Sequence, residues 1–267
     1  METYRLKNIA IVILLLLNAC LLLMVGGQHY QSLQAERQAA VQLRELYRSS
    51  QLSLSGRIDL AQQPLKALTL SRQADTEQSI ASALLGGETL FTSQGGGIYN
   101  YESRQRAIQF RAGGSFYGSR LDLPVEDASD FARSFCGQFG YEEPLVRLDE
   151  EGSGSAIAGQ LAEGVPVTNC AVELYFEEGS LVSVTGAHVS LQDAAADSGE
   201  GMTCITALVR FLDFRNTSGA VCSEVSGVRC VYQLQSTSAP RLLPVWEIET
   251  DTYTYYVDCE TGEVYAQ

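Results

Sequence analysis

Few residues of this 267-residue chain are of the types that carry out enzyme chemistry. The chain has only two histidines, His29 and His188, and the motifs HExxH and GxSxG are both absent. The sequence therefore signals neither a zinc protease site nor a serine hydrolase triad. We predict no catalytic residue, no cofactor and no metal site, and we expect a protein that is not an enzyme.

The cysteines are the other candidates for chemistry. No CxxC motif occurs, which argues against zinc ribbons and thioredoxin-like sites. An even number lies beyond the apolar N-terminal run, and in an exported domain this permits disulfides. Cys222 and Cys230 are the simplest candidate pair, close across a short hairpin. The alternative is that most of these cysteines are small buried apolar residues that stay reduced, and both readings remain open. The six are Cys136, Cys170, Cys204, Cys222, Cys230 and Cys259.

Charge is unevenly distributed along the chain. The net charge is −14 overall, with +4 over residues 1–121 and −18 over residues 122–267. An acidic C-terminal half repels phosphate backbones, so we expect no nucleic-acid partner and favour a basic or zwitterionic protein partner. The acidic clusters lack the alternating ligands of a calcium loop and are typical of solvated loops. No small-molecule substrate is evident.

The N-terminus predicts a membrane anchor. An uncharged apolar run over residues 9–27 is long enough to cross a hydrocarbon core of roughly 30 Å. Arg5 and Lys7 precede this run, which predicts a cytoplasmic tail at residues 1–8 and an extracytoplasmic C-terminal region. Asn18 is a candidate contact with another membrane helix, or is simply tolerated. A cleaved signal peptide and a lipid-modified Cys20 fit the length and composition of the run less well.

The next two segments are predicted to be a stalk and a mixed domain. Residues 28–50 lack Gly and Pro and should form a helical stalk. Its apolar stripe is too short for a stable coiled coil, so we expect it to pair only where the membrane helices hold it beside a partner helix. Residues 51–123 predict an N-terminal α+β domain with a strand over residues 52–60, a helix over residues 75–85 and four short strands over residues 88–123. A capping-box-like spacing at Asp75 to Gln78 marks the helix start. The stripe comprises Tyr30, Leu33, Ala40, Leu43 and Tyr47.

Residues 124–192 and 201–267 repeat one pattern, a helix followed by strands. Pro166-Val167 and Pro244-Val245 occupy corresponding positions, which indicates duplication of one unit in which a helix packs on an antiparallel sheet. In the second unit Trp246 and Ile248 alternate with Glu247 and Glu249. We therefore expect Trp246, Ile248 and Tyr256 in the module core and the two glutamates in water.

The last quarter of the chain resembles a PepSY-type module. Its helix is followed by P-V-W-x-I and then by a hairpin that ends Y-Y-V-D-x-x-T-G-E-V, matched by Tyr255, Tyr256, Val257, Asp258, Thr261, Gly262, Glu263 and Val264. With one membrane helix, a stalk and paired units of this kind, the whole arrangement is similar to the YycI and YycH family. These are membrane-anchored regulators of an essential cell-wall sensor histidine kinase in Gram-positive bacteria.

This resemblance implies a function without catalysis. We expect a single-pass cell-membrane protein whose extracytoplasmic part modulates a cell-envelope sensor histidine kinase by protein contact, alone or with a sister regulator that has one membrane span. The family supplies no catalytic residues to transfer. The alternative is a PepSY-like inhibitor or chaperone of an exported peptidase or cell-wall hydrolase.

Overall fold

The computed structural model describes residues 34–266 except residues 36, 200 and 238. In this part the chain is a mixed α+β protein dominated by antiparallel sheet, which confirms the α+β part of the predicted fold class. The predicted tail, the membrane helix over residues 9–27 and Asn18 lie outside the described residues. Among the residues that are described, no helix is both long and apolar enough to cross a bilayer.

One plan, a helix followed by four antiparallel strands, occurs three times along the chain. The first unit contains α2 (Ala74–Leu85), β3 (Leu90–Gly95), β4 (Ile98–Ser103), β5 (Arg106–Arg111) and β6 (Ser115–Pro124). The second contains α3 (Ala128–Gln138), β7 (Leu145–Leu148), β8 (Gly154–Ala162), β9 (Val165–Glu177) and β10 (Ser180–Ala187). The third contains α4 (Cys204–Ser218), β12 (Glu224–Gln235), β13 (Arg241–Thr250), β14 (Thr254–Asp258) and β15 (Val264–Ala266).

Local sequence explains where these helices begin and end. The side chain of Asp127 accepts a hydrogen bond from the backbone N–H of Asp130 and starts α3. Gly86, with φ of 75°, ends α2, because glycine adopts this left-handed conformation without strain. The predicted cap of α2 is wrong: the N-cap is Gln73, which makes no side-chain capping bond, and Asp75 lies inside the first turn.

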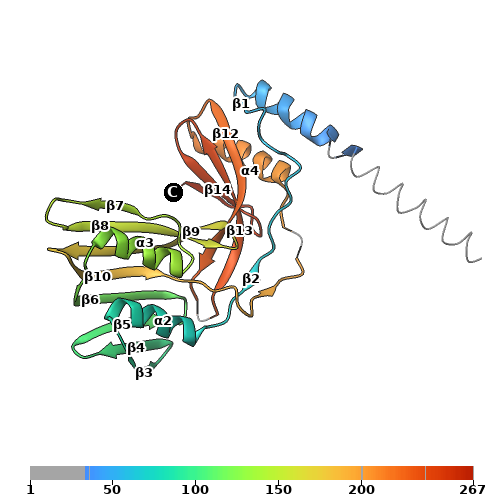
Figure 1. Ribbon diagram of the computed structural model, residues 1–267. Helices are drawn as coiled ribbons and strands as arrows, with labels where there is room; N and C mark the ends of the chain where they lie inside the picture. Colours follow the sequence, from blue (N-terminus) through green and yellow to red (C-terminus); the bar gives the residue numbers. More distant parts are fainter. Residues whose placement is uncertain (1–33, 36, 200, 238, 267) are drawn as a thin grey trace, which may run out of the picture.

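The first two units merge into one sheet with the strand order β7-β8-β9-β10-β6-β5-β4-β3. The fourth strand of each unit pairs with the other, with Val184 opposite Gly118, so the first strands β7 and β3 form the two outer edges. Figure 1 shows α2 and α3 on the same side of this sheet. Their buried side chains share one hydrophobic core with the strands, and we call this body the first lobe.

The third unit forms a second lobe with its own core. Trp246, Ile248 and Phe211 are fully buried there, between α4 and the strands β12 to β14. The short strand β1 (Ser53–Leu54) runs parallel to β12, while β2 (Leu68–Thr69) joins β13 to β11 (Ala195–Ala196). One parallel pair between β12 and β9 connects the sheets of the two lobes.

The C-terminal part of the predicted stalk is not free to pair with another helix. Residues 37–49 are helical, and Leu43 and Tyr47 are buried in the core of the second lobe. The Tyr47 hydroxyl donates a 2.8 Å hydrogen bond to the carbonyl oxygen of Leu208 in α4. The apolar stripe is therefore used within the chain at these two positions, because α4 offers them a complementary apolar surface.

Direct hydrogen bonds hold the two lobes together. The Asn169 amide in β9 donates to the carbonyl of Leu234 in β12 at 2.8 Å and accepts from its N–H at 2.7 Å. The Ser236 hydroxyl donates to the carbonyl oxygen of Gly113 at 2.8 Å. Breaking these hydrogen bonds would leave buried backbone groups without partners, which costs free energy. The contact between the lobes, which we call the joint, therefore fixes their relative position.

Candidate functional site

The sheet of the first lobe has one face covered by helices and one face left open. Strand β9 shows the alternation directly: Leu174 and Phe176 are buried under the helices, whereas Glu173, Tyr175 and Glu177 are exposed. Antiparallel sheets commonly leave one face in water, and such a face normally carries polar side chains. The open face of this sheet departs from that rule, because large apolar side chains lie along it.

One cross-strand row spans the open face from edge to edge. Leu145 and Tyr117 in this row are each 57% exposed, and Ile157 is 41% exposed. Only one member of the row is charged. From β7 to β3 its members are Leu145, Ile157, Glu173, Thr185, Tyr117, Gln109, Asn100 and Thr92.

A second row on the same face places Tyr175, which is 42% exposed, next to Ser183 and Ser119. Tyr117 on β6 and Tyr175 on β9 thus lie on the same face, on either side of β10. Exposed tyrosines flanked by small polar residues and few charges are typical of protein interfaces, because the ring buries apolar area and the hydroxyl finds a hydrogen bond. We call the two rows the open face and consider it the candidate site.

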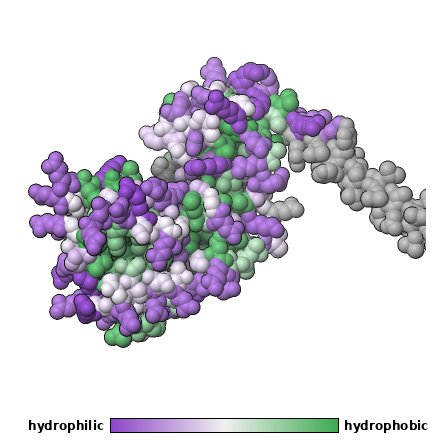
Figure 2. Space-filling model, viewed as in Figure 1, coloured by the Kyte–Doolittle hydropathy of each residue, from purple (hydrophilic) through white to green (hydrophobic). Residues whose placement is uncertain are grey.

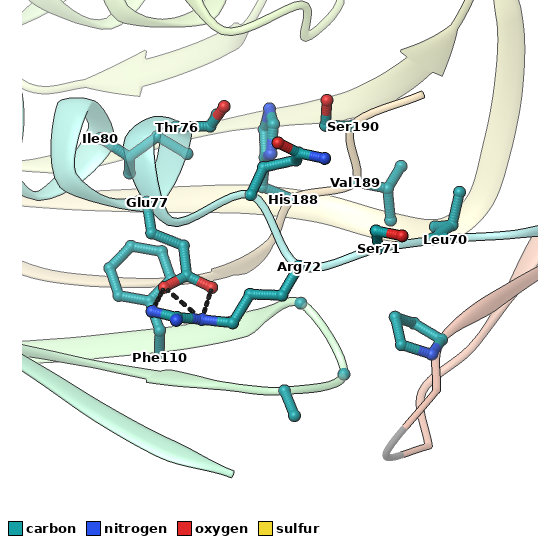
Figure 3. A pocket seen from close by; sticks show the side chains of 15 residues that line it. Leu70, Ser71, Arg72, Thr76, Glu77, Ile80, Phe110, His188, Val189 and Ser190 are labelled. Atoms are coloured by element: carbon teal, nitrogen blue, oxygen red, sulfur yellow. Dashed lines mark hydrogen bonds and ion pairs between the residues drawn. The ribbon is translucent and has the colours of Figure 1, made fainter. Parts of the chain in front are cut away.

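A small cavity lies at the joint between the lobes (Figure 3). Its volume is about 40 Å³, and it lies between the N-terminus of α2, the β5–β6 turn and the segment after β10. The Arg72 Nε lies 3.0 Å from Glu77 Oε1, and the Arg72 guanidinium covers the ring of Tyr99. A cavity of this size holds about one water molecule and cannot enclose an organic ligand. It is a packed joint.

His188 borders that cavity without the features of a catalytic base. Burial lowers its pKa to about 4, although the nearby Phe139 carbonyl opposes this effect. Its Nε2 lies 3.1 Å from that carbonyl oxygen, and its ring meets the edge of Tyr141. The imidazole is therefore neutral at ordinary pH and acts as a packing residue. Within the described residues, no group of three or more His, Cys, Asp or Glu side chains could hold a metal ion.

The structure places the predicted module residues on two sides of the third sheet. Trp246 and Ile248 face α4, and the Trp246 indole N–H donates to the Met202 carbonyl at 2.7 Å. Tyr256 lies in a small cluster on the other side. The expectation that Glu247 faces water is wrong: it is only 5% exposed, because Arg229 pairs with it at 2.6 Å and the Tyr256 hydroxyl donates to it.

The proposed pairing of Cys222 with Cys230 is also corrected. No hairpin separates them, since β12 begins at Glu224 and runs through Cys230, which carries the two cysteines away from each other. Both are free thiols. The Cys230 sulfur instead lies beside Cys259, which is also a free thiol, and the Leu65 N–H points at the Cys230 sulfur from 3.4 Å.

The residues of the open face were not identified from sequence. The alternation of apolar and polar residues along β9 predicts that the sheet has two different faces. It does not predict which face the helices cover once the strands of another unit extend the sheet. The available signal was an excess of large side chains, such as Tyr117 and Tyr175, on positions that alternate with the buried ones.

Comparisons with known proteins found similarity to solved structures at low sequence identity. No family model matches the chain, and no curated protein matches it. An uncharacterized protein from Eubacterium rectale superposes with a TM-score of 0.45 at 13% identity, over 81% of this chain and 91% of that one. The YpeB C-terminal domain of Bacillus megaterium superposes with a TM-score of 0.35 at 11% identity, over 74% of this chain and 98% of that one. Neither similarity is strong enough to define the fold or the function.

Proposed function

We propose that this protein is a membrane-anchored extracytoplasmic regulator with three PepSY-like units that modulates a cell-envelope sensor histidine kinase by direct contact. The observation that carries the proposal is the open face. A sheet of eight strands displays Tyr117, Tyr175, Ile157 and Leu145 to solvent on its uncovered side. Large apolar side chains gathered on one face mark an interaction surface more often than a chance arrangement.

The chemistry of the chain supports a protein partner. The open face is broad and has few charges, whereas small-molecule sites are concave and enclosed. Residues 122–267, which supply four of the eight strands of this sheet, carry a net charge of −18, so a basic surface would be steered toward this part of the chain. A regulator of this kind acts by binding one conformation of the kinase more tightly than the other.

The experiment that tests this proposal is crosslinking in native membranes followed by recovery of the full chain. We would compare the intact protein with a variant whose residues 8–27 are replaced by an unrelated membrane helix. Recovery of a sensor kinase, or of a sister regulator with one membrane span, is the expected result. Loss of that partner on replacement would assign part of the contact to the membrane helix.

A different recovered partner would contradict the proposal. An exported peptidase or cell-wall hydrolase that is captured equally by both forms would favour an inhibitor or chaperone, because the membrane segment would then act only as an anchor. Loss of the kinase from a chain altered only on the open face would separate the role of that face from the role of the membrane helix.

A further inference from the structure

Strand β3 leaves an unprotected edge on the first lobe. All six residues of β3 are exposed, and β3 pairs only with β4 within the described part of the chain. Its outer backbone N–H and C=O groups are therefore available to another strand. Leu90 is 75% exposed and Phe91 is 49% exposed. Figure 2 shows apolar colour at the lower margin of the molecule, where Figure 1 draws β3.

The corresponding edge of the second unit is protected. Strand β7 is the first strand of its unit, as β3 is of the first, and it forms the opposite edge of the same sheet. Glu142, Glu143 and Pro144 immediately precede β7, and Arg147 lies within it. Charged residues and proline are the usual means by which proteins block unwanted strand pairing. The chain therefore blocks one of two equivalent edges and leaves the other open.

The distribution of charge favours a second copy of this chain as the occupant of the open edge. No charged residue lies between Glu88 and Glu102, although the chain as a whole carries −14. Two copies of so acidic a protein repel each other over most of their surfaces. Strand β3 itself carries no charged residue, so this repulsion is weakest along its edge. An antiparallel pair of identical strands also satisfies two-fold symmetry by construction.

We propose that two copies of this protein pair through β3, in antiparallel register centred on Thr92, and join their first-lobe sheets into one. Thr92 of one copy then lies opposite Thr92 of the other, and Phe91 lies opposite Ser93. The two-fold axis is perpendicular to the sheet, so the helices of both copies lie on one side. Thr92 belongs to the cross-strand row of the open face, so the open faces of the two copies become continuous.

The test uses the full chain in detergent, with its protein mass measured by light scattering after size-exclusion chromatography. The wild-type chain is expected to be a dimer. Thr92→Lys and Thr92→Glu each place like charges opposite each other and are expected to weaken the dimer at least tenfold. An equimolar mixture of the two variants restores it, because Lys then faces Glu. Only contact between the two altered positions explains this rescue.

Matched substitutions at the protected edge serve as the control. Leu145→Lys and Leu145→Glu change an exposed position on β7, and we expect both proteins to remain dimers. Circular dichroism of every variant verifies that the fold is intact. A monomeric wild-type chain overturns the proposal. A dimer that Thr92→Lys and Thr92→Glu leave unchanged also overturns it, because the contact would then lie elsewhere.

Discussion

At the scale of single residues, the buried imidazole of His188 couples stability to pH. Burial lowers its pKa to about 4 in the folded protein, whereas in the unfolded chain it titrates near its ordinary value of 6.5. Between these two values the unfolded chain binds a proton that the folded chain does not. Stability therefore falls as the pH falls from 6.5 toward 4, by roughly 3 kcal/mol over the whole window.

Replacing the imidazole with a side chain that does not titrate tests this coupling. His188→Asn should lower stability at pH 7 and should also remove this component of the pH dependence. Urea unfolding followed by circular dichroism at pH 7 and at pH 4.5 gives the two free energies for each protein. Equal losses of stability on acidification in the wild type and the variant would exclude His188 as the cause.

Glu247 provides a second residue-scale prediction. Its carboxylate is buried, and it depends on the Arg229 guanidinium and the Tyr256 hydroxyl. Arg229→Met keeps the apolar stem but leaves the carboxylate without its countercharge, which should cost about 2–3 kcal/mol. Trp246, the only tryptophan of the chain, reports unfolding of this lobe by its fluorescence.

An exposed ion pair is the control for that measurement. Arg48 and Glu45 pair at 3.0 Å with both side chains more than two-thirds exposed, so Arg48→Met should change stability by less than about 0.5 kcal/mol. Similar effects of Arg48→Met and Arg229→Met would show that burial of Glu247 has no energetic weight.

At the scale of elements, the helix at residues 37–49 should behave as part of the second lobe. Tyr47 is 1% exposed and its hydroxyl bonds to α4. Tyr47→Ala should remove that anchor, and the amides of residues 40–49 should then lose most of their protection against hydrogen exchange. The exposed Tyr253→Ala is the control. Protection that persists in Tyr47→Ala would mean that the helix is held by other contacts.

Helix positions could be predicted from the sequence because their signals are local. Gly86 ends α2, and the apolar spacing of α4 brings Phe211 and Leu212 to the core. The alternation around Trp246 likewise predicted its burial. Strand pairing between units could not be predicted, because the contact of β6 with β10 joins segments of separate repeats. The burial of Glu247 could not be predicted for the same reason, because Arg229 in β12 and Tyr256 in β14 cover its side chain.

For the candidate site, the sequence supplied the exposed tyrosines but not their common surface. Tyr117 lies on β6 and Tyr175 on β9, and only the merged sheet brings them to one face. The sequence predicted a separate domain at residues 51–123. The fold repeats the plan of a helix followed by four strands there, but the sequence of this segment shows little similarity to the other two units. The open face forms where the first two units, which share this plan, join their sheets through β6 and β10.

At the scale of the whole molecule, the joint between lobes determines how a signal could pass. Asn169 and Ser236 hold the lobes by hydrogen bonds, and the small cavity beside them leaves little free volume. A body this tightly joined presents its open face at a fixed orientation to the helix at residues 37–49, which packs in the core of the second lobe. Regulation by contact requires such fixed geometry, because a loosely tethered face would bind both kinase conformations alike.

The most direct test of the account is removal of the two tyrosines from the open face. Tyr117→Ala/Tyr175→Ala in the full chain should keep the fold and should reduce crosslinking to the sensor kinase at least tenfold, because central tyrosines often dominate interface energy. Tyr253→Ala removes a tyrosine of the third unit that is 62% exposed, and it should leave the yield unchanged. Undiminished capture of the kinase by the double variant would contradict the claim that this face binds the partner.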